Sequence, residues 1–402
     1  MKWLVPENEL DVEQHDFLTS LEYYKNQNRW IDGFPGSGKS VLLLYAAKLI
    51  KEREPQSTIL FVEFTHALIN MISASLYKLL GSNIAATIPV QTYYDFVNDV
   101  KDYDYILCDE VQDLPSKALR AIRIYARKQV IVAGDLNQSI YITDPQWREP
   151  VCTPKEINDE LQINNRVSLH IIHRLTPSIM KAVNCFLPSV NIMQGKWSMT
   201  KSDTSIRVWK MANPEDEINR VMKEALERTN LDNAVGILFK HHREVVRFVN
   251  TWLGIQRLEK WKSKWEKGKP RYDLLNEHLE NLNIPLQYVG NGYGSFVMEK
   301  SKITLMTYHS SKGIDFDTVF LPYLNDAKVD VDIEYDKRLL MVAMTRSRQD
   351  LFISYTKKLN ENITAFIREH FVNFKNFETE GNGELFNDQA QSNNTQTEDE
   401  FA

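Results

Sequence analysis

Short apolar stretches alternate with longer segments of helical periodicity along the chain. ILFVEFT, YDYILCDE and KQVIVAGD lie in the first part, and SIRVWKM, NAVGILF, KITLMTYH, DTVFLPY and DLFISYT follow residue 200. Strands that are apolar on both faces and alternate with helices are typical of parallel sheets covered by helices. The pattern predicts an α/β fold with two parallel sheets, each flanked by helices.

The break between the two series of strands predicts the domain organisation. We expect a first domain at 1–185, a linker at 186–205 and a second domain at 206–377. Two domains agree with the length of 402 residues, because a single core rarely grows beyond about 250 to 300 residues. Near the N-terminus, apolar residues at helical spacing follow Asp11 and predict a helix: Val12, Phe17, Leu18 and Leu21.

The charge of the chain is unevenly distributed. The net charge is -6, but residues 378–402 hold seven acidic and no basic residues, so the rest of the chain has a net charge of +1. A polar acidic segment buries too little apolar surface to fold alone. We therefore expect a disordered, solubilising tail, with GELF and EDEF as alternative docking peptides for a partner.

Targeting signals and disulfides are not expected. No apolar run reaches the ~20 residues that span a bilayer, and acidic residues appear too early for a signal peptide. The three cysteines, Cys108, Cys152 and Cys185, lie far apart without metal-ligand spacing. These features predict a reduced, cytoplasmic protein without a membrane contact.

A glycine-rich loop supplies the first candidate chemistry. GFPGSGKS fits the pattern G-x4-G-K-[ST] between an apolar strand and an apolar helix, and this context favours a phosphate loop over an ordinary turn. Lys39 is expected to meet the β and γ phosphates and Ser40 to bind Mg²⁺. The predicted nucleotide contacts are Gly33, Phe34, Pro35, Gly36, Ser37, Gly38, Lys39 and Ser40.

Acidic and polar residues end two further strands. Asp109 and Glu110 close YDYILCDE, and Asp135 and Gln138 follow the strand VIVAG. The carboxyl ends of parallel strands share one edge of a sheet, where ligands bind in open α/β folds. We expect Asp109 to hold Mg²⁺, Glu110 to orient the attacking water and Gln138 to sense the γ-phosphate; for Gln138, an ordinary polar turn is the alternative.

Six stretches together resemble superfamily-one helicases of the UvrD/Rep type. They are LDVEQHDFL, GFPGSGKS, DEVQD, GDLNQSIY, TYHSSKGIDFDTVFLP and RLLMVAMTRSRQDLFISY, and they span about residues 10 to 356. The resemblance implies two RecA-like domains of the P-loop NTPase class that use ATP and Mg²⁺. It also implies movement along single-stranded DNA in the 3′ to 5′ direction.

The resemblance assigns further roles to individual residues. Gln14 would read adenine, Arg346 and Arg174 would be arginine fingers, and Gly313 and Asp315 would lie near the nucleotide. For both arginines an ion pair between domains is the alternative.

The sequence also departs from the family pattern. His173 stands where the family has a tyrosine that stacks on adenine, Val41 replaces the usual arginine after the phosphate loop, and Asp315 replaces the usual glutamate. These changes predict looser selection of the base.

The resemblance places nucleic acid across both domains. It points to Thr65, His66, Thr92, Tyr93 and His309, although lone His and Tyr residues are as often structural. Tyr141 or Trp147 is expected to stack on bases, with burial in the core as the alternative for each. RNA in place of DNA stays open.

A basic stretch at 251–271 contains Trp261 and Trp265, four residues apart, which on a helix would share one face. Its charge suits binding of a phosphate backbone or of an acidic protein partner. The alternative is a solvated helix whose tryptophans pack against its own domain. The acidic tail is a second candidate site for a protein partner. The spacing of about 70 residues between Ser40 and Asp109, and of about 60 between NAVGILF and KITLMTYH, leaves no room for large inserted accessory domains.

The sequence therefore predicts a minimal ATP-dependent translocase or helicase that serves DNA repair, replication or anti-phage defence. One alternative is a DNA-stimulated ATPase switch or loading subunit that does not unwind by itself. A small-molecule kinase with the same phosphate loop is the remote alternative, and it would leave DEVQD, SSKGIDFD and VAMTRSR unexplained.

Overall fold

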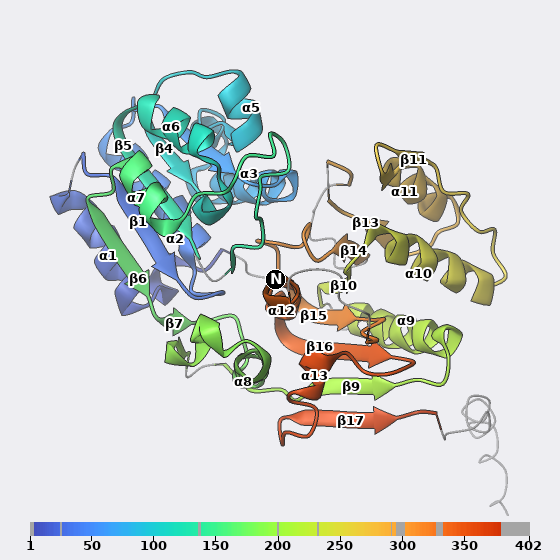
Figure 1. Cartoon of the computed structure of the whole chain (residues 1–402). Helices are drawn as coiled ribbons and strands as arrows, with labels where there is room; N and C mark the ends of the chain where they lie inside the picture. The colour runs from blue at the N-terminus through green and yellow to red at the C-terminus, as the bar shows by residue number, and fades with distance from the viewer. Residues whose placement is uncertain are drawn as a thin grey trace, which may run out of the picture.

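The computed structural model describes residues 4–24, 26–135, 138–198, 201–230, 233–290, 292–294, 302–326 and 333–378. These residues form two α/β units, each built around a parallel sheet (Figure 1). The fold class predicted from the apolar stretches is confirmed. Within the described ranges, no helix has both the length and the apolar character needed to cross a membrane.

The first sheet has six strands within the described chain, in the order β3-β2-β4-β5-β1-β6, and neighbouring strands are parallel. All five residues of β2 are buried, as expected for a central parallel strand. The strands are β1 (Arg29–Gly33), β2 (Ile59–Glu63), β3 (Val90–Thr92), β4 (Tyr103–Cys108), β5 (Ala126–Gly134) and β6 (Asn165–Leu169). The helices are α1 (Val12–Tyr23), α2 (Lys39–Arg53), α3 (His66–Leu80), α4 (Ser82–Ala85), α5 (Tyr93–Asn98), α6 (Ser116–Ile124) and α7 (Pro154–Leu161).

The second sheet has seven strands among the described residues, in the order β13-β14-β10-β15-β16-β9-β17, again with parallel neighbours. The strands are β9 (Ile206–Lys210), β10 (Val235–Phe239), β13 (Leu286–Tyr288), β14 (Ile303–Thr307), β15 (Phe316–Leu321), β16 (Ser347–Tyr355) and β17 (Val372–Asn376). The helices are α9 (Pro214–Asn230), α10 (His242–Ile255), α11 (Tyr272–Asn281), α12 (Ile333–Met344) and α13 (Glu361–Thr364).

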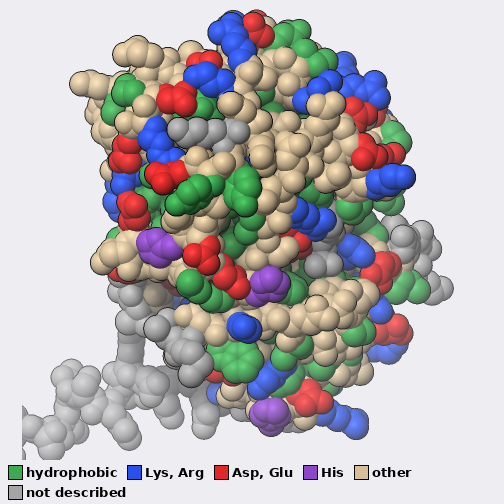
Figure 2. All heavy atoms as spheres, turned by 90° about the vertical axis from the view of Figure 1, so that its left-hand side faces the viewer, with side chains coloured by type: hydrophobic (Ala, Val, Ile, Leu, Met, Phe, Trp, Pro, Cys, Tyr) green, Lys and Arg blue, Asp and Glu red, His purple; other side chains and the backbone are tan. Residues whose placement is uncertain are grey.

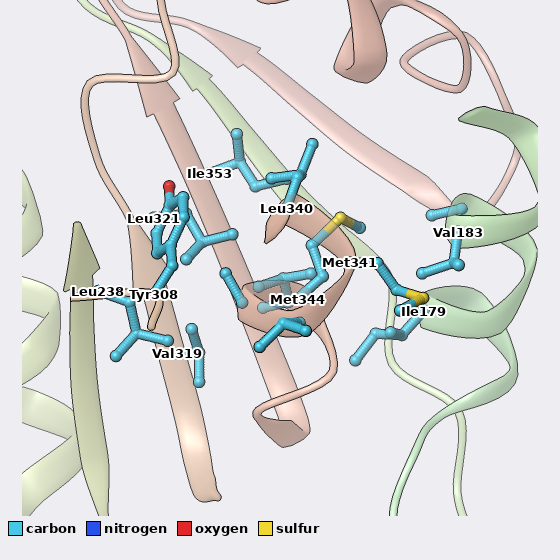
Figure 3. Close-up of a cluster of buried hydrophobic side chains, with 14 of the residues drawn as sticks. Ile179, Val183, Leu238, Tyr308, Val319, Leu321, Leu340, Met341, Met344 and Ile353 are labelled. Atoms are coloured by element: carbon cyan, nitrogen blue, oxygen red, sulfur yellow. The ribbon is translucent and has the colours of Figure 1, made fainter. Parts of the chain in front are cut away.

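The connection between the sheets is packed rather than extended. Thr176 caps α8 (Pro177–Phe186) with its side chain, and Pro177 suits the first turn because that position needs no N–H partner. Figure 3 shows Ile179 and Val183 of α8 beside Met341 of α12, in a cluster shared with the second sheet. A short parallel pair, β7 (Ile171–Ile172) and β8 (Lys196–Trp197), lies nearby in the chain. The boundary at 186–205 stays a prediction, but the core of the second sheet already includes α8.

The segment 251–271 is not the helix on which Trp261 and Trp265 would share one face. α10 ends at Ile255, and a hairpin follows, made of β11 (Trp265–Glu266) and β12 (Lys269–Pro270). Lys267 and Gly268 have φ of +49° and +77°, which form a tight two-residue turn and cannot continue a helix. A helical face shared by Trp261 and Trp265 is therefore wrong: Trp261 is buried, and Trp265 is 49% exposed.

The predicted acidic tail lies almost entirely outside the described residues. Only Glu378 is described, and its carboxylate lies 2.5 Å from Nζ of Lys210. GELF and EDEF both fall outside the described ranges.

Candidate functional site

The loop between β1 and α2 has a backbone that only glycine fits at two positions. Gly36 and Gly38 have φ of +77° and +87°. A Cβ on Gly36 would lie 2.6 Å from Cβ of Arg174, and one on Gly38 would lie 2.4 Å from Nε2 of Gln14. The loop thus packs against both side chains and leads into α2, whose N-terminal N–H groups favour an anion.

Polar groups at the start of α2 face the end of β4. Nζ of Lys39 donates to the carbonyl oxygens of Gly33 (2.8 Å) and Phe34 (3.0 Å). Oγ of Ser40 donates to Oδ2 of Asp109. Hydroxyl and carboxylate oxygens are ligands that Mg²⁺ accepts beside phosphate. This donor set fits a nucleotide phosphate at the loop and Mg²⁺ at Ser40 and Asp109.

The two adjacent carboxylates at the end of β4 have different environments. Burial and the charge of Glu110 raise the pKa of Asp109. Burial alone would also raise the pKa of Glu110, but Lys312 and Lys39 bring it below its ordinary value. Glu110 has φ of +52°, and its Oε2 accepts a 2.5 Å hydrogen bond from Nε2 of Gln112. Glu110 is therefore the more acidic carboxylate of the pair, and its ionised form can orient water or accept a proton.

A cavity of about 300 Å³ lies over the loop, with walls from both units. Every residue predicted to act in hydrolysis lines it, whereas Gly33, Phe34, Pro35 and Ser37 belong to the loop without lining it. The walls include Gln14, Gly36, Gly38, Lys39, Ser40, Asp109, Glu110, Gln138, His173 and Arg174, together with Lys201, Gly313, Asp315, Arg346 and Arg348.

Arg346 connects the two units at this cavity. It directly precedes β16, is 1% exposed, and donates from Nη2 to Oε1 of Gln138 at 2.8 Å. Nε2 of Gln138 in turn donates to Asp135 at 2.9 Å. Burial and the nearby charge of Arg174 lower the pKa of Arg346 to about 9. A guanidinium held in this way presents positive charge to the cavity, which the nucleotide phosphates would neutralise.

A second bridge between the units runs through Asp315. Its carboxylate accepts from Nη1 of Arg174 at 3.2 Å and from Nη2 of Arg348 at 2.7 Å. Despite burial, Arg348 and Arg174 lower the pKa of Asp315. The ion pair between the units, which is the alternative role for Arg174, is thus present, and it lies within the wall of the cavity.

Six residues predicted to contact nucleic acid line one groove of about 480 Å³ between the units, whereas Trp147, the alternative to Tyr141, does not line it. Tyr141 packs against Phe64, with ring centroids 4.8 Å apart, and against His309, at 5.8 Å. Trp147 instead packs against Tyr93 and Tyr94. The six predicted residues are Thr65, His66, Thr92, Tyr93, Tyr141 and His309.

The groove is largely uncharged at neutral pH apart from its lysines. Burial lowers the pKa of His309 and of His242 to about 4, so both rings are neutral. Lys240 and Lys269 also line the groove. Aromatic rings with a few cations suit a strand that is bound through its bases and phosphates without sequence reading.

Two family models match separate parts of the chain. A model described as an AAA domain matches residues 19–144, which hold the phosphate loop and DEVQD. A model of the UvrD-like helicase C-terminal domain matches residues 275–358, which hold Asp315 and Arg346. The ATP-dependent DNA helicase Rep of Buchnera aphidicola subsp. Schizaphis graminum is 40% identical over 63 residues, and DNA helicase II of Rickettsia typhi is 28% identical over 123 residues. The chain is thus similar to UvrD/Rep-type helicases of superfamily one. Its two parallel α/β units agree with the two RecA-like domains that this similarity implies.

The similarity covers limited parts of these relatives. The two matches cover 14% and 24% of this chain and 10% and 19% of the relatives. The ATP-dependent DNA helicase PcrA of Bacillus subtilis is 35% identical over 66 residues, 14% of this chain and 9% of PcrA. Among solved structures, the Arterivirus nonstructural protein 10 helicase with DNA has a TM-score of 0.43 at 16% identity, covering 81% of this chain and 60% of that chain. The chain thus spans about a fifth or less of these curated relatives.

The part of the cavity wall near Gln14 contains a histidine that contacts a carboxylate. Nε2 of His173 lies 2.6 Å from Oδ2 of Asp11, and Nε2 of Gln14 donates to the carbonyl of Ser37 at 3.0 Å. Asp11 also caps α1, which fixes Gln14 one turn into that helix. Gln14 and His173 thus both line the cavity, Gln14 positioned by the cap of α1 and His173 by its contact with Asp11.

Sequence reasoning missed Lys312, which is 1% exposed and reaches from the second unit into the first. Nζ of Lys312 contacts Asp113 and donates to the carbonyl of Gln138 at 2.7 Å. Its place in SSKG, between two assigned residues, was a signal for this role. Arg348, two residues after Arg346, offered a similar signal.

Glu63, at the end of β2, was also missed. It is fully buried, and neither side-chain oxygen has a hydrogen-bond partner among the described residues. Burial and the charges of Asp109 and Glu110 raise its pKa well above the ordinary value. Its place inside the apolar run ILFVEFT, which predicts a strand buried on both faces, was the signal for its burial.

Proposed function

We propose that this chain is an ATP-dependent motor that moves along single-stranded DNA. The cavity would bind ATP and Mg²⁺, and the groove would bind the strand. The donor set at Lys39, Ser40 and Asp109, the similarity to UvrD/Rep-type helicases and the aromatic lining of the groove support this proposal.

The observation that carries the proposal is that two short segments each reach both sites. In the first unit, Gln138 lines the cavity and Tyr141, three residues later, lines the groove. In the second unit, His309 lines the groove and Gly313, four residues later, lines the cavity. We infer that a change at the nucleotide is transmitted to the strand through these connections of three and four residues.

The residues of the cavity have separable tasks in this proposal. Lys39 and the loop bind the phosphates, Glu110 orients the attacking water, and Arg346 neutralises charge that develops during phosphoryl transfer. Mg²⁺, bound at Ser40 and Asp109, would supply charge neutralisation at the phosphates. Because Arg346 contacts Gln138 across the units, hydrolysis would loosen their contact and shift the strand.

Finer points rest on the resemblance alone. We propose DNA as the strand and 3′ to 5′ as the direction, with RNA as the alternative substrate. A protein partner at 251–271 or at the acidic tail remains a prediction, as does a place in DNA repair, replication or anti-phage defence.

The sequence predicts no inserted accessory domain at two places, and the described chain has none at either place. The described chain from β2 to β4 contains only α3, α4, β3 and α5, and that from β10 to β13 contains only α10, the hairpin and α11. We therefore expect translocation without efficient separation of long duplexes.

The proposal is tested by the ATP hydrolysis rate of the purified chain alone and with single-stranded DNA, duplex DNA or single-stranded RNA. We expect at least tenfold stimulation by single-stranded DNA, and displacement of a protein block from a single strand. Equal rates under all four conditions would contradict the motor, and efficient unwinding of tailed duplexes of several tens of base pairs would contradict the limit on duplex separation.

A further inference from the structure

The hairpin region 257–271, here named the basic hairpin, concentrates positive charge outside the groove. It has seven basic residues and two acidic ones, and all residues from 262 to 269 are exposed. The face of the molecule in Figure 2, the left-hand side of Figure 1, carries acidic and basic side chains interspersed. Clustered positive charges repel one another, so the basic hairpin favours a partner that carries many negative charges.

The basic hairpin is fixed to the second unit at both ends. Trp261 is buried. Its backbone N–H donates to Oδ1 of Asn250 at 2.8 Å, and Nδ2 of Asn250 donates to the backbone carbonyl of Trp261 at 3.0 Å. Pro270 is buried at the other end. The ring of Tyr272, just beyond, stacks on Tyr288 with centroids 3.4 Å apart. The exposed lysines therefore project from a supported turn.

The basic hairpin is continuous with the groove. Lys269, in β12, lines the groove together with His242 of α10, and His242 lies 2.8 Å from the hydroxyl of Tyr272. In Figure 1, β11 and α11 lie at the end of the second unit opposite β17. A chain of phosphates that leaves the groove at Lys269 would thus meet the other lysines next.

Trp265 adds a flat apolar surface to this charge. It pairs with Pro270 across the hairpin and is 49% exposed. An exposed tryptophan between lysines can stack on a base, whereas the lysines contact the backbone. The combination suits a single strand better than an acidic peptide, which offers charge without stacking bases.

We propose that the basic hairpin is a second binding site for the strand, which takes the phosphate backbone and one base just outside the groove. This inference rests on the proposed function, because it assumes that a strand occupies the groove. It assigns to Lys262, Lys264, Lys267 and Trp265 a role that neither family model nor sequence motif gives them.

The test compares two lengths of single-stranded DNA, about eight nucleotides to fill the groove and about 24 nucleotides to pass beyond it. The variant is the triple charge reversal Lys262→Glu, Lys264→Glu, Lys267→Glu, and the matched control reverses three exposed lysines that do not line the groove, Lys155, Lys223 and Lys375. Fluorescence anisotropy gives Kd over a range of salt concentrations, and thermal melting confirms folding.

We expect the hairpin triple variant to bind the long strand at least tenfold more weakly than the control, with a salt slope smaller by about 2 for three lost phosphate contacts. Its Kd for the short strand should match that of the control. Trp265→Ala, which leaves the charges intact, should weaken only the long strand, by about fivefold.

Equal Kd of the hairpin triple variant and the control for the long strand would overturn the inference, and would leave an acidic protein as the partner of this surface. Equal weakening for both lengths would also overturn it, because the lysines would then act on the groove itself. If the unaltered chain binds neither strand, the proposed function fails, and the inference fails with it.

Discussion

The cavity and the groove lie between the same two units, yet their walls use different chemistry. At the cavity, Arg346 and Asp315 are almost fully buried and reach partners across the units, as does Lys312 beside it. In the groove, rings such as Tyr141 and His309 line the walls, and partial burial lowers the pKa of His309 and His242 so that both are neutral. Buried charges require defined partners, whereas ring faces accept many bases. The cavity is thus built for one ligand geometry and the groove for a strand of any sequence.

The largest expected effect falls on the cavity. Lys39→Ala removes the cation at the phosphate loop, and Glu110→Gln removes the carboxylate that orients water, so each should lower kcat at least 10³-fold. Glu110→Gln should still bind ATP, which equilibrium binding of a fluorescent analogue measures. Turnover within threefold of the unaltered chain for either variant would refute these roles.

A smaller effect is expected where the cavity depends on the second unit. Arg346→Ala should lower kcat at least 10²-fold with little change in KM, because the guanidinium acts mainly on charge that develops in the transition state. Arg346→Lys keeps the positive charge but loses the planar set of N–H donors, so it should recover only part of the kcat that Arg346→Ala loses. A large rise in KM at unchanged kcat would show that Arg346 only anchors the nucleotide.

In the groove, single changes should have moderate effects. Tyr141→Ala should weaken binding of single-stranded DNA about tenfold through loss of a stacking surface, and Tyr141→Phe, which keeps the ring, should change it less than twofold. Nucleotide affinity measured without DNA should be unchanged in both. If the two variants bind DNA equally well, Tyr141 belongs to the core.

The smallest effect concerns stability and pH. The pKa of Glu63 is raised in the folded chain, so its contribution to stability is full below the unfolded pKa of about 4.5 and is lost as pH rises. Glu63→Gln avoids that loss. Its unfolding free energy relative to the unaltered chain should therefore increase between pH 5 and pH 8, by up to ~1.4 kcal/mol per pH unit.

Glu54→Gln is the matched control for this measurement. Lys128 and Ser57 lower the pKa of Glu54 to about 2, so this variant should be destabilised at pH 7 and progressively less as pH falls below the unfolded value. Chemical denaturation at several pH values measures both differences. A constant difference for Glu63→Gln would mean that its carboxyl is not held neutral.

Much of the fold and of the cavity was predictable from the sequence. The strands appear as continuous apolar runs, and the phosphate loop requires glycine at fixed positions, as the contacts of Gly36 and Gly38 explain. Five of the nucleic-acid residues followed from the family resemblance, and the structure brings them together with Tyr141 at one groove. Their individual roles remain predictions.

The rest depends on distances that a linear pattern does not contain. Lys312 is important only because it reaches Asp113, 199 residues away in sequence. Glu63 is unusual because its buried carboxyl oxygens have no hydrogen-bond partner among the described residues. The hairpin was missed because the spacing of Trp261 and Trp265 also fits a helix, and the turn at Lys267 and Gly268 lacks the Asn-Gly or Asp-Gly pair that such turns favour.

The central claim is that the cavity and the groove are coupled through the segments 138–141 and 309–313. The most direct measurement is the Kd of single-stranded DNA for the Glu110→Gln variant with ATP and with ADP, since this variant would hold ATP without turnover. We predict at least a fivefold difference in Kd between the two nucleotides, and a reciprocal change in nucleotide affinity when DNA is added. The same DNA Kd with both nucleotides, in a variant that binds both, would contradict the account.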